Sequence, residues 1–94
     1  MQYILIADDN QDITDILSTY VVNEGFEPLI AKDGAEAIQM FNRYNPVLVL
    51  LDVMMPKKDG YQVCREIREK SDVPVIIITA RGEDFERIMG LDIG

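Results

Sequence analysis

Three short apolar runs of strand-forming residues divide this chain, and they constrain its fold more than any other feature. They cover residues 3–7, 47–51 and 75–79. Each run is apolar throughout instead of alternating, as in parallel strands that are covered on both faces. Segments with apolar residues at helical spacing separate the runs. The sequence therefore predicts an α/β fold, a doubly wound parallel sheet with helices on both faces and right-handed crossovers.

Helical segments are expected at about residues 11–24, 34–44 and 84–91, with another that follows Asp59 and carries Tyr61, Val63, Cys64 and Ile67. In the first, apolar residues recur at helical spacing from Ile13 to Val21, and Gly25 suits its end. Candidate capping residues precede three of these segments: Asn10 or Asp12, Asp33 with Glu36, and Asp59 with Gln62. A further short strand is expected at residues 27–30, where Pro28 lacks a donor for the sheet and so favours an edge position.

The chain is expected to form one domain, residues 1–94, and to be incomplete at its C-terminus. It ends after the fourth expected helix with no strand to follow, so residues 75–79 would form a bare sheet edge. We therefore expect either further chain beyond Gly94 or a partner that covers this edge. A truncated chain is the preferred interpretation.

Composition excludes several function classes. The chain is 48% hydrophobic and 28% charged, which is typical of a globular protein. Nine basic and seventeen acidic residues give a net charge of −8, which argues against nucleic-acid binding by this segment. No apolar stretch approaches the roughly 20 residues that span a bilayer, and no signal peptide precedes the first strand. With a single cysteine, Cys64, a cytoplasmic location is expected.

Acidic residues follow two of the apolar runs. Asp8 and Asp9 follow the first, and Asp52 follows the second. Because ligands of parallel sheets bind at the carboxyl ends of strands, these acids should share one hollow, where they repel one another unless a cation lies between them. The chain has no histidine, so oxygen ligands and Mg²⁺, Mn²⁺ or Ca²⁺ are expected. A metal-clamped carboxylate is a candidate nucleophile toward phosphorus.

Two further features lie at the same expected edge. Thr79 ends the third run, where its hydroxyl can hydrogen-bond a phosphoryl oxygen. Taken alone, a strand-end acid is usually solvated and a strand-end threonine is usually a strand former, but together they favour a site. In the loop after Asp52, Pro56 fixes one φ angle and Gly60 allows a conformation closed to other residues.

Four motifs carry a resemblance to a known family. They are Ile6-Ala7-Asp8-Asp9-Asn10, Leu50-Leu51-Asp52-Val53-Met54-Met55-Pro56, Asp59-Gly60 and Ile77-Ile78-Thr79-Ala80. Over its whole length the chain resembles the receiver domain of a two-component response regulator. The resemblance implies a flavodoxin-like sheet with strand order 2-1-3-4-5, of which strand 5 and the last helix are missing here.

The resemblance also implies roles for individual residues. Asp52 would accept a phosphoryl group from a sensor histidine kinase. Asp8 and Asp9 would bind Mg²⁺, with the Asp52 carboxylate and the backbone carbonyl of Met54 as further ligands. Thr79 would be the switch hydroxyl that meets the phosphoryl group. Such a domain is no enzyme beyond catalysing its own phosphorylation and dephosphorylation.

The chain lacks two residues that are typical of the family, and the resemblance also has implications for the complete protein. The family's fifth-strand lysine and aromatic switch residue are absent from these 94 residues. The complete protein would form a homodimer on phosphorylation, and the ending at residues 90–94 resembles regulators that continue into a winged-helix DNA-binding domain controlling transcription. No membrane association is implied.

Two alternatives remain. One is a phosphorylation-independent interaction module on the same fold. The other is a magnesium-dependent phosphatase of the haloacid dehalogenase type, which is less favoured because such enzymes need Asp-x-Asp after the first strand and this chain has adjacent Asp8 and Asp9.

Overall fold

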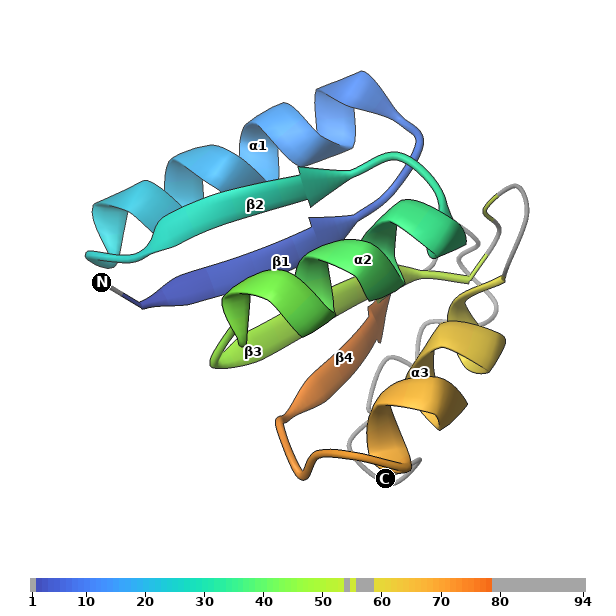
Figure 1. The fold of residues 1–94 in the computed structure, drawn as a ribbon. Coiled ribbons are helices and arrows are strands. Elements are labelled where there is room, and N and C mark those ends of the chain that lie inside the picture. Colours follow the sequence, from blue (N-terminus) through green and yellow to red (C-terminus); the bar gives the residue numbers. More distant parts are fainter. Residues whose placement is uncertain (1, 54, 56–58, 79–94) are drawn as a thin grey trace.

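A single parallel sheet forms the centre of the molecule, with α1 on one face and α2 and α3 on the other (Figure 1). The computed structural model describes residues 2–53, 55 and 59–78. The strands are β1 (Tyr3–Ala7), β2 (Glu27–Ala31), β3 (Leu48–Asp52) and β4 (Val75–Ile78). Their order is β2-β1-β3-β4, and every pair is parallel. The predicted doubly wound topology is therefore confirmed for the described strands.

The register of the sheet brings particular strand ends together. Ala7 of β1 pairs with Ala31 of β2 on one side and with Leu51 of β3 on the other, so these three strands end at the same level. Pro28 lies on β2, which is an edge strand of this sheet, as the sequence predicted. Proline, which has no N–H group to donate, therefore lies on a strand that has a neighbouring strand on one side only.

Each helix begins at a polar residue that binds the free N–H groups of its first turn. The helices are α1 (Gln11–Asn23), α2 (Gly34–Tyr44) and α3 (Gly60–Arg68). Asn10, not Asp12, caps α1 through its side-chain oxygen and the Ile13 N–H. Asp59 and Gln62 form the reciprocal capping box expected for α3. The fourth expected helix, residues 84–91, lies outside the described residues.

The cap of α2 differs in detail from the expected pattern. Asp33 accepts a hydrogen bond from the Glu36 N–H at 2.8 Å, as a capping residue should. The Glu36 carboxylate accepts a hydrogen bond from the Lys32 N–H at 2.7 Å, one residue before the position that a capping box would use. The side chain of Glu36 thus fixes the connection between β2 and α2.

The apolar core has two parts, one on each face of the sheet. The larger part lies between the sheet and the pair α2 and α3, and includes the fully buried side chains of Leu5, Leu51 and Ile67. The smaller part lies under α1 around Ile6 and Val21. Burial of a side chain of this size stabilises the fold by about 1.5–3 kcal/mol.

The apolar face predicted for α1 is only partly buried. Val21 is 5% exposed, whereas Ile16 is 57% exposed and Tyr20 is 66% exposed. Helical spacing identified α1 correctly but did not show that these two side chains lie on its outer face.

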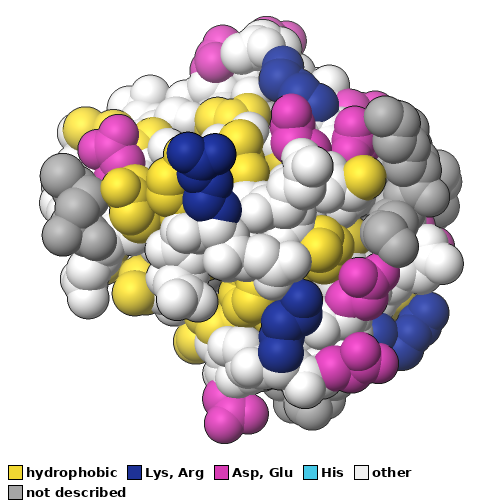
Figure 2. Space-filling model, in the orientation of Figure 1, with side chains coloured by type: hydrophobic (Ala, Val, Ile, Leu, Met, Phe, Trp, Pro, Cys, Tyr) yellow, Lys and Arg dark blue, Asp and Glu magenta, His cyan; other side chains and the backbone are white. Residues whose placement is uncertain are grey.

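Charges on the molecular surface are mixed. On the α2 and α3 face, the described basic side chains lie apart from one another, among apolar and acidic groups (Figure 2). This distribution agrees with the net charge of −8, and the described residues form no broad basic area on that face for phosphate contacts. Within the part of the chain that the structure describes, no helix has the length and apolar character needed to cross a membrane.

Arg68 ties the end of α3 to the loop that leads into β4. Its guanidinium donates one hydrogen bond to the Ser71 carbonyl at 2.7 Å and another to the Val73 carbonyl. We expect Arg68→Ala to lower the free energy of unfolding by about 1–3 kcal/mol, because both part-buried carbonyls lose a charged donor. Urea denaturation measures this loss. Arg65→Ala, on an exposed position of the same helix, is the control and should change stability little.

Candidate metal centre

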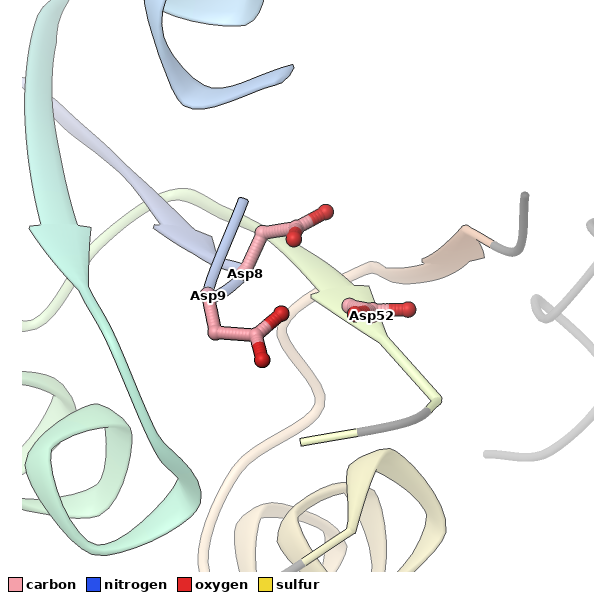
Figure 3. Close-up of side chains that lie close together, drawn as sticks. All are labelled: Asp8, Asp9 and Asp52. Atoms are coloured by element: carbon pink, nitrogen blue, oxygen red, sulfur yellow. The ribbon is translucent and has the colours of Figure 1, made fainter. Parts of the chain in front are cut away.

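Three aspartates meet at the carboxyl ends of β1 and β3. Asp52 is the last residue of β3, and Asp8 and Asp9 directly follow β1, which pairs with β3. One carboxylate oxygen from each residue lies within 4.8 Å of the others (Figure 3). The structure therefore brings together the three acids that the sequence singled out, although their role stays a prediction.

Asp8 is the buried member of this acidic cluster, which comprises Asp8, Asp9 and Asp52. It is only 3% exposed, and its backbone N–H is held by the Ala31 carbonyl of β2 at 3.0 Å. Its carboxylate accepts a hydrogen bond from the Asn10 N–H at 2.9 Å. Burial raises the pKa of the Asp8 carboxyl, the Asn10 N–H opposes the rise, and the neighbouring charge of Asp9 adds to it.

The cluster is open on one side. Asp9 is exposed and Asp52 is half-buried, so a cation can enter from solvent while Asp8 forms the floor of the site. Hard dications such as Mg²⁺ need oxygen ligands at about 2.0–2.1 Å in near-octahedral geometry and usually retain several waters. Three convergent carboxylates with an open side meet that demand and leave coordination positions for phosphoryl oxygens. The residues present fit Mg²⁺.

Two predicted members of the site lie outside the described residues. They are Met54, whose carbonyl was expected to bind the metal, and Thr79, the expected switch hydroxyl. Their roles remain predictions from the resemblance. Pro56 of the same loop also lies outside the described residues.

The structure corrects one expectation about the loop after Asp52. The sequence indicated that Gly60 allows a backbone conformation closed to other residues, but among the described glycines only Gly25 has positive φ, at 89°. Gly60 is instead the first residue of α3, and its N–H donates to the Val53 carbonyl at 3.0 Å. Its special requirement is space, because it lies against the backbone of Asp52.

Sequence reasoning missed a hydrogen-bonded group near the cluster. The Lys32 ammonium donates to the Gln11 side-chain carbonyl at 2.8 Å, and the Gln11 amide donates to the Asp15 carboxylate at 2.8 Å. Lys32 follows β2, and Gln11 is the first residue of α1. The group therefore links the loops that follow β1 and β2. Nothing in the sequence pairs residues 11 and 32, which only the strand register brings together.

A parallel sheet with an open cluster of carboxylates at its carboxyl edge defines the chain as an α/β protein with a candidate cation site. The sequence model of the "Response regulator receiver domain" matches residues 4–94. The chain therefore belongs to the receiver domain family of two-component response regulators, and the resemblance seen in its motifs is confirmed.

Curated relatives of the chain are transcriptional regulators. The "Probable transcriptional regulator ycf27" of Galdieria sulphuraria is 53% identical over 91 residues, which cover 97% of this chain and 36% of that protein. The "Transcriptional regulatory protein CpxR homolog" of Haemophilus influenzae is 48% identical over 94 residues, which cover 100% of this chain and 41% of the relative. The chain thus spans little more than a third of the length of such relatives.

Solved structures with the same fold are also receiver domains. A Francisella response regulator receiver domain matches with a TM-score of 0.84 and 32% identity, covering 100% of this chain and 78% of that one. Response regulator protein TrrA from Thermotoga maritima, solved in complex with Mg²⁺-BeF, matches with a TM-score of 0.82 and 35% identity. The match covers 96% of this chain and 79% of the TrrA chain. The fold is therefore the flavodoxin-like receiver fold, as expected.

TrrA has also been solved in complex with the histidine kinase ThkA. In that structure the match has a TM-score of 0.77 and 40% identity, and it covers 85% of this chain and 70% of the other. A regulator similar to this chain thus assembles with a histidine kinase.

Proposed function

We propose that this receiver domain accepts a phosphoryl group on Asp52 from a sensor histidine kinase, in a reaction that requires Mg²⁺. The convergence of the Asp8, Asp9 and Asp52 carboxylates within 4.8 Å, with the buried Asp8 at the floor, is the observation that supports this proposal best. The relatives TrrA and ThkA, solved together, support the choice of a histidine kinase as donor.

In the proposed reaction, a carboxylate oxygen of Asp52 attacks the phosphorus. The bond between phosphorus and the donor's imidazole nitrogen breaks, and its electron pair leaves with the imidazole. Asp8, Asp9 and Asp52 would hold Mg²⁺, which when bound neutralises charge on the phosphoryl oxygens. Asp8 contributes a carboxylate in a fixed position, since its backbone N–H and its carboxylate are both hydrogen-bonded in place.

The product is proposed to act as a switch, not as an enzyme intermediate. An aspartyl phosphate adds negative charge and strong acceptor oxygens at the end of β3, and the Thr79 hydroxyl is proposed to move to meet them. The Met54 carbonyl is proposed as a further metal ligand. In the longer protein we propose a cytoplasmic regulator that dimerises on phosphorylation and controls transcription through a DNA-binding domain.

Metal removal tests the proposal directly. Incubation with acetyl phosphate and Mg²⁺ should add one phosphoryl group per chain, visible by intact-protein mass spectrometry. The group should be labile to hydroxylamine, as acyl phosphates are. Excess EDTA should prevent its addition, and added Mg²⁺ should restore it. A product that resists hydroxylamine, or labelling that EDTA leaves unchanged, would contradict the proposed reaction.

An interaction module that works without phosphorylation remains the second interpretation. It predicts a protein that takes up no phosphoryl group from acetyl phosphate at saturating Mg²⁺, although it is folded. The same mass measurement therefore separates the two interpretations.

A further inference from the structure

Gly60 lies directly against the peptide group of Asp52. A Cβ atom at residue 60 would lie 2.4 Å from the Asp52 carbonyl oxygen, 3.0 Å from the Asp52 carbonyl carbon and 3.0 Å from the Val53 Cα. All three are backbone atoms, so no side chain can rotate away to make room. The first turn of α3 can therefore approach the end of β3 this closely only because residue 60 has no side chain.

The α3 side of this contact is held in place. On the α3 side, the Gly60 N–H donates to the Val53 carbonyl at 3.0 Å, and the Asp59 and Gln62 capping box closes the first turn. The buried face of α3 packs into the larger core through Val63 and other apolar side chains. Because α3 cannot retreat without opening that core, a methyl group at residue 60 would push on the Asp52 peptide.

We propose that Gly60 is a positioning residue for Asp52. Its missing side chain sets the place of the Asp52 backbone, and thereby the distance of the Asp52 carboxylate from Asp8 and Asp9. This inference rests on the proposed function, in which those carboxylates share one Mg²⁺. The inference adds that the selectivity of the site for Mg²⁺ depends on the contact between Asp52 and Gly60, a residue that is not itself a metal ligand.

The two common hard dications respond differently to a displaced ligand. Mg²⁺ demands near-ideal octahedral geometry at about 2.0–2.1 Å, whereas Ca²⁺ accepts six to eight oxygens at about 2.3–2.6 Å in flexible arrangements. A shift of Asp52 by a few tenths of an ångström should therefore weaken Mg²⁺ binding more than Ca²⁺ binding. General loss of stability would not change the ratio of the two affinities in the folded protein.

We expect Gly60→Ala to raise the Kd for Mg²⁺ by about tenfold or more, within the range found when residues supporting metal ligands are changed. The Kd for Ca²⁺ should rise by a smaller factor. Isothermal titration calorimetry with each metal alone, at a temperature where circular dichroism shows the variant folded, gives both values.

Gly25→Ala is a matched control. Gly25 has φ of 89°, so alanine there is strained, yet no heavy atom beyond its chain neighbours lies within 4 Å of the position that a Cβ at this residue would take. Gly25 lies between α1 and β2, at the amino end of β2, whereas the acidic cluster lies at the carboxyl ends of β1 and β3. This variant should lose stability, by about 1 kcal/mol, without a change in either metal affinity.

If Gly60→Ala is largely unfolded without metal, refolding by each ion replaces the titration. Each ion stabilises the folded state according to its affinity for that state. The ratio of the Ca²⁺ effect to the Mg²⁺ effect on folding should then be larger for the variant than for wild type.

Three results are separable. Wild-type ratios of Mg²⁺ to Ca²⁺ binding or refolding in Gly60→Ala would overturn the positioning role. If the Asp52→Asn variant binds Mg²⁺ with the wild-type affinity, the proposed metal site itself is overturned. A selective loss of Mg²⁺ binding in Gly60→Ala, absent from Gly25→Ala, supports the inference.

Discussion

Asp52→Asn is expected to abolish phosphoryl transfer, lowering the labelling by acetyl phosphate by about 100-fold or more. An amide oxygen is a poor nucleophile toward phosphorus, and the substitution also removes one of three negative charges that would hold Mg²⁺. The fold should persist, because Asp52 is half-buried at the end of β3 and asparagine has nearly the same shape. Intact mass after reaction measures the labelling, and circular dichroism checks the fold.

Asp12→Asn provides the control for the change in charge. Asp12 is an exposed acid in the first turn of α1 and is not part of the acidic cluster. The control should be labelled at the wild-type rate. Full labelling of Asp52→Asn, or equal losses in both variants, would refute Asp52 as the acceptor.

Asp8→Asn is expected to produce two opposite effects, a more stable metal-free protein and the loss of most Mg²⁺ affinity. Burial raises the pKa of Asp8, so its ionised form is disfavoured in the folded protein. Asparagine keeps an oxygen that can accept the Asn10 N–H but carries no charge. The melting temperature without metal should therefore rise by a few degrees, while stabilisation by added Mg²⁺ should largely disappear.

The dependence on pH follows from the direction of that shift. Because the folded state holds the Asp8 proton more tightly than the unfolded chain does, this residue's contribution to stability is fully present below its unfolded pKa. That contribution is lost as the pH rises through the folded pKa. The stability difference between Asp8→Asn and wild type should thus grow over this interval and then level off.

Urea denaturation in EDTA across acidic to neutral pH measures this difference. If the metal-free Asp8→Asn protein is less stable than wild type at neutral pH, the interpretation that burial disfavours the ionised form of Asp8 is contradicted.

Much of the architecture could be predicted because it follows from one-dimensional patterns. Continuous apolar runs identified β1, β3 and β4, and Pro28 placed β2 at an edge. Once the strands were taken as parallel, Asp8 and Asp52 had to meet, since parallel neighbours end on the same side of the sheet. The acidic cluster therefore followed from the topology without knowledge of any contact.

What the sequence did not show depends on distances between segments. Ile16 and Tyr20 have the helical spacing of core residues, but they are 57% and 66% exposed. Gly60 was expected to serve a backbone angle, and its actual constraint is the proximity of the Asp52 carbonyl. Both require knowing how closely a helix lies on the sheet, which periodicity does not contain.

The buried position of Asp8 has a consequence for how such a domain evolves. If Asp8 destabilises the metal-free protein and binds Mg²⁺ as proposed, its carboxylate is retained only while that ion-dependent chemistry is under selection. A lineage that lost its upstream phosphate donor would be free to replace this acid, and it would gain thermal robustness by doing so. Degenerate descendants of this domain are therefore expected to change residue 8 early and to keep the surrounding sheet intact.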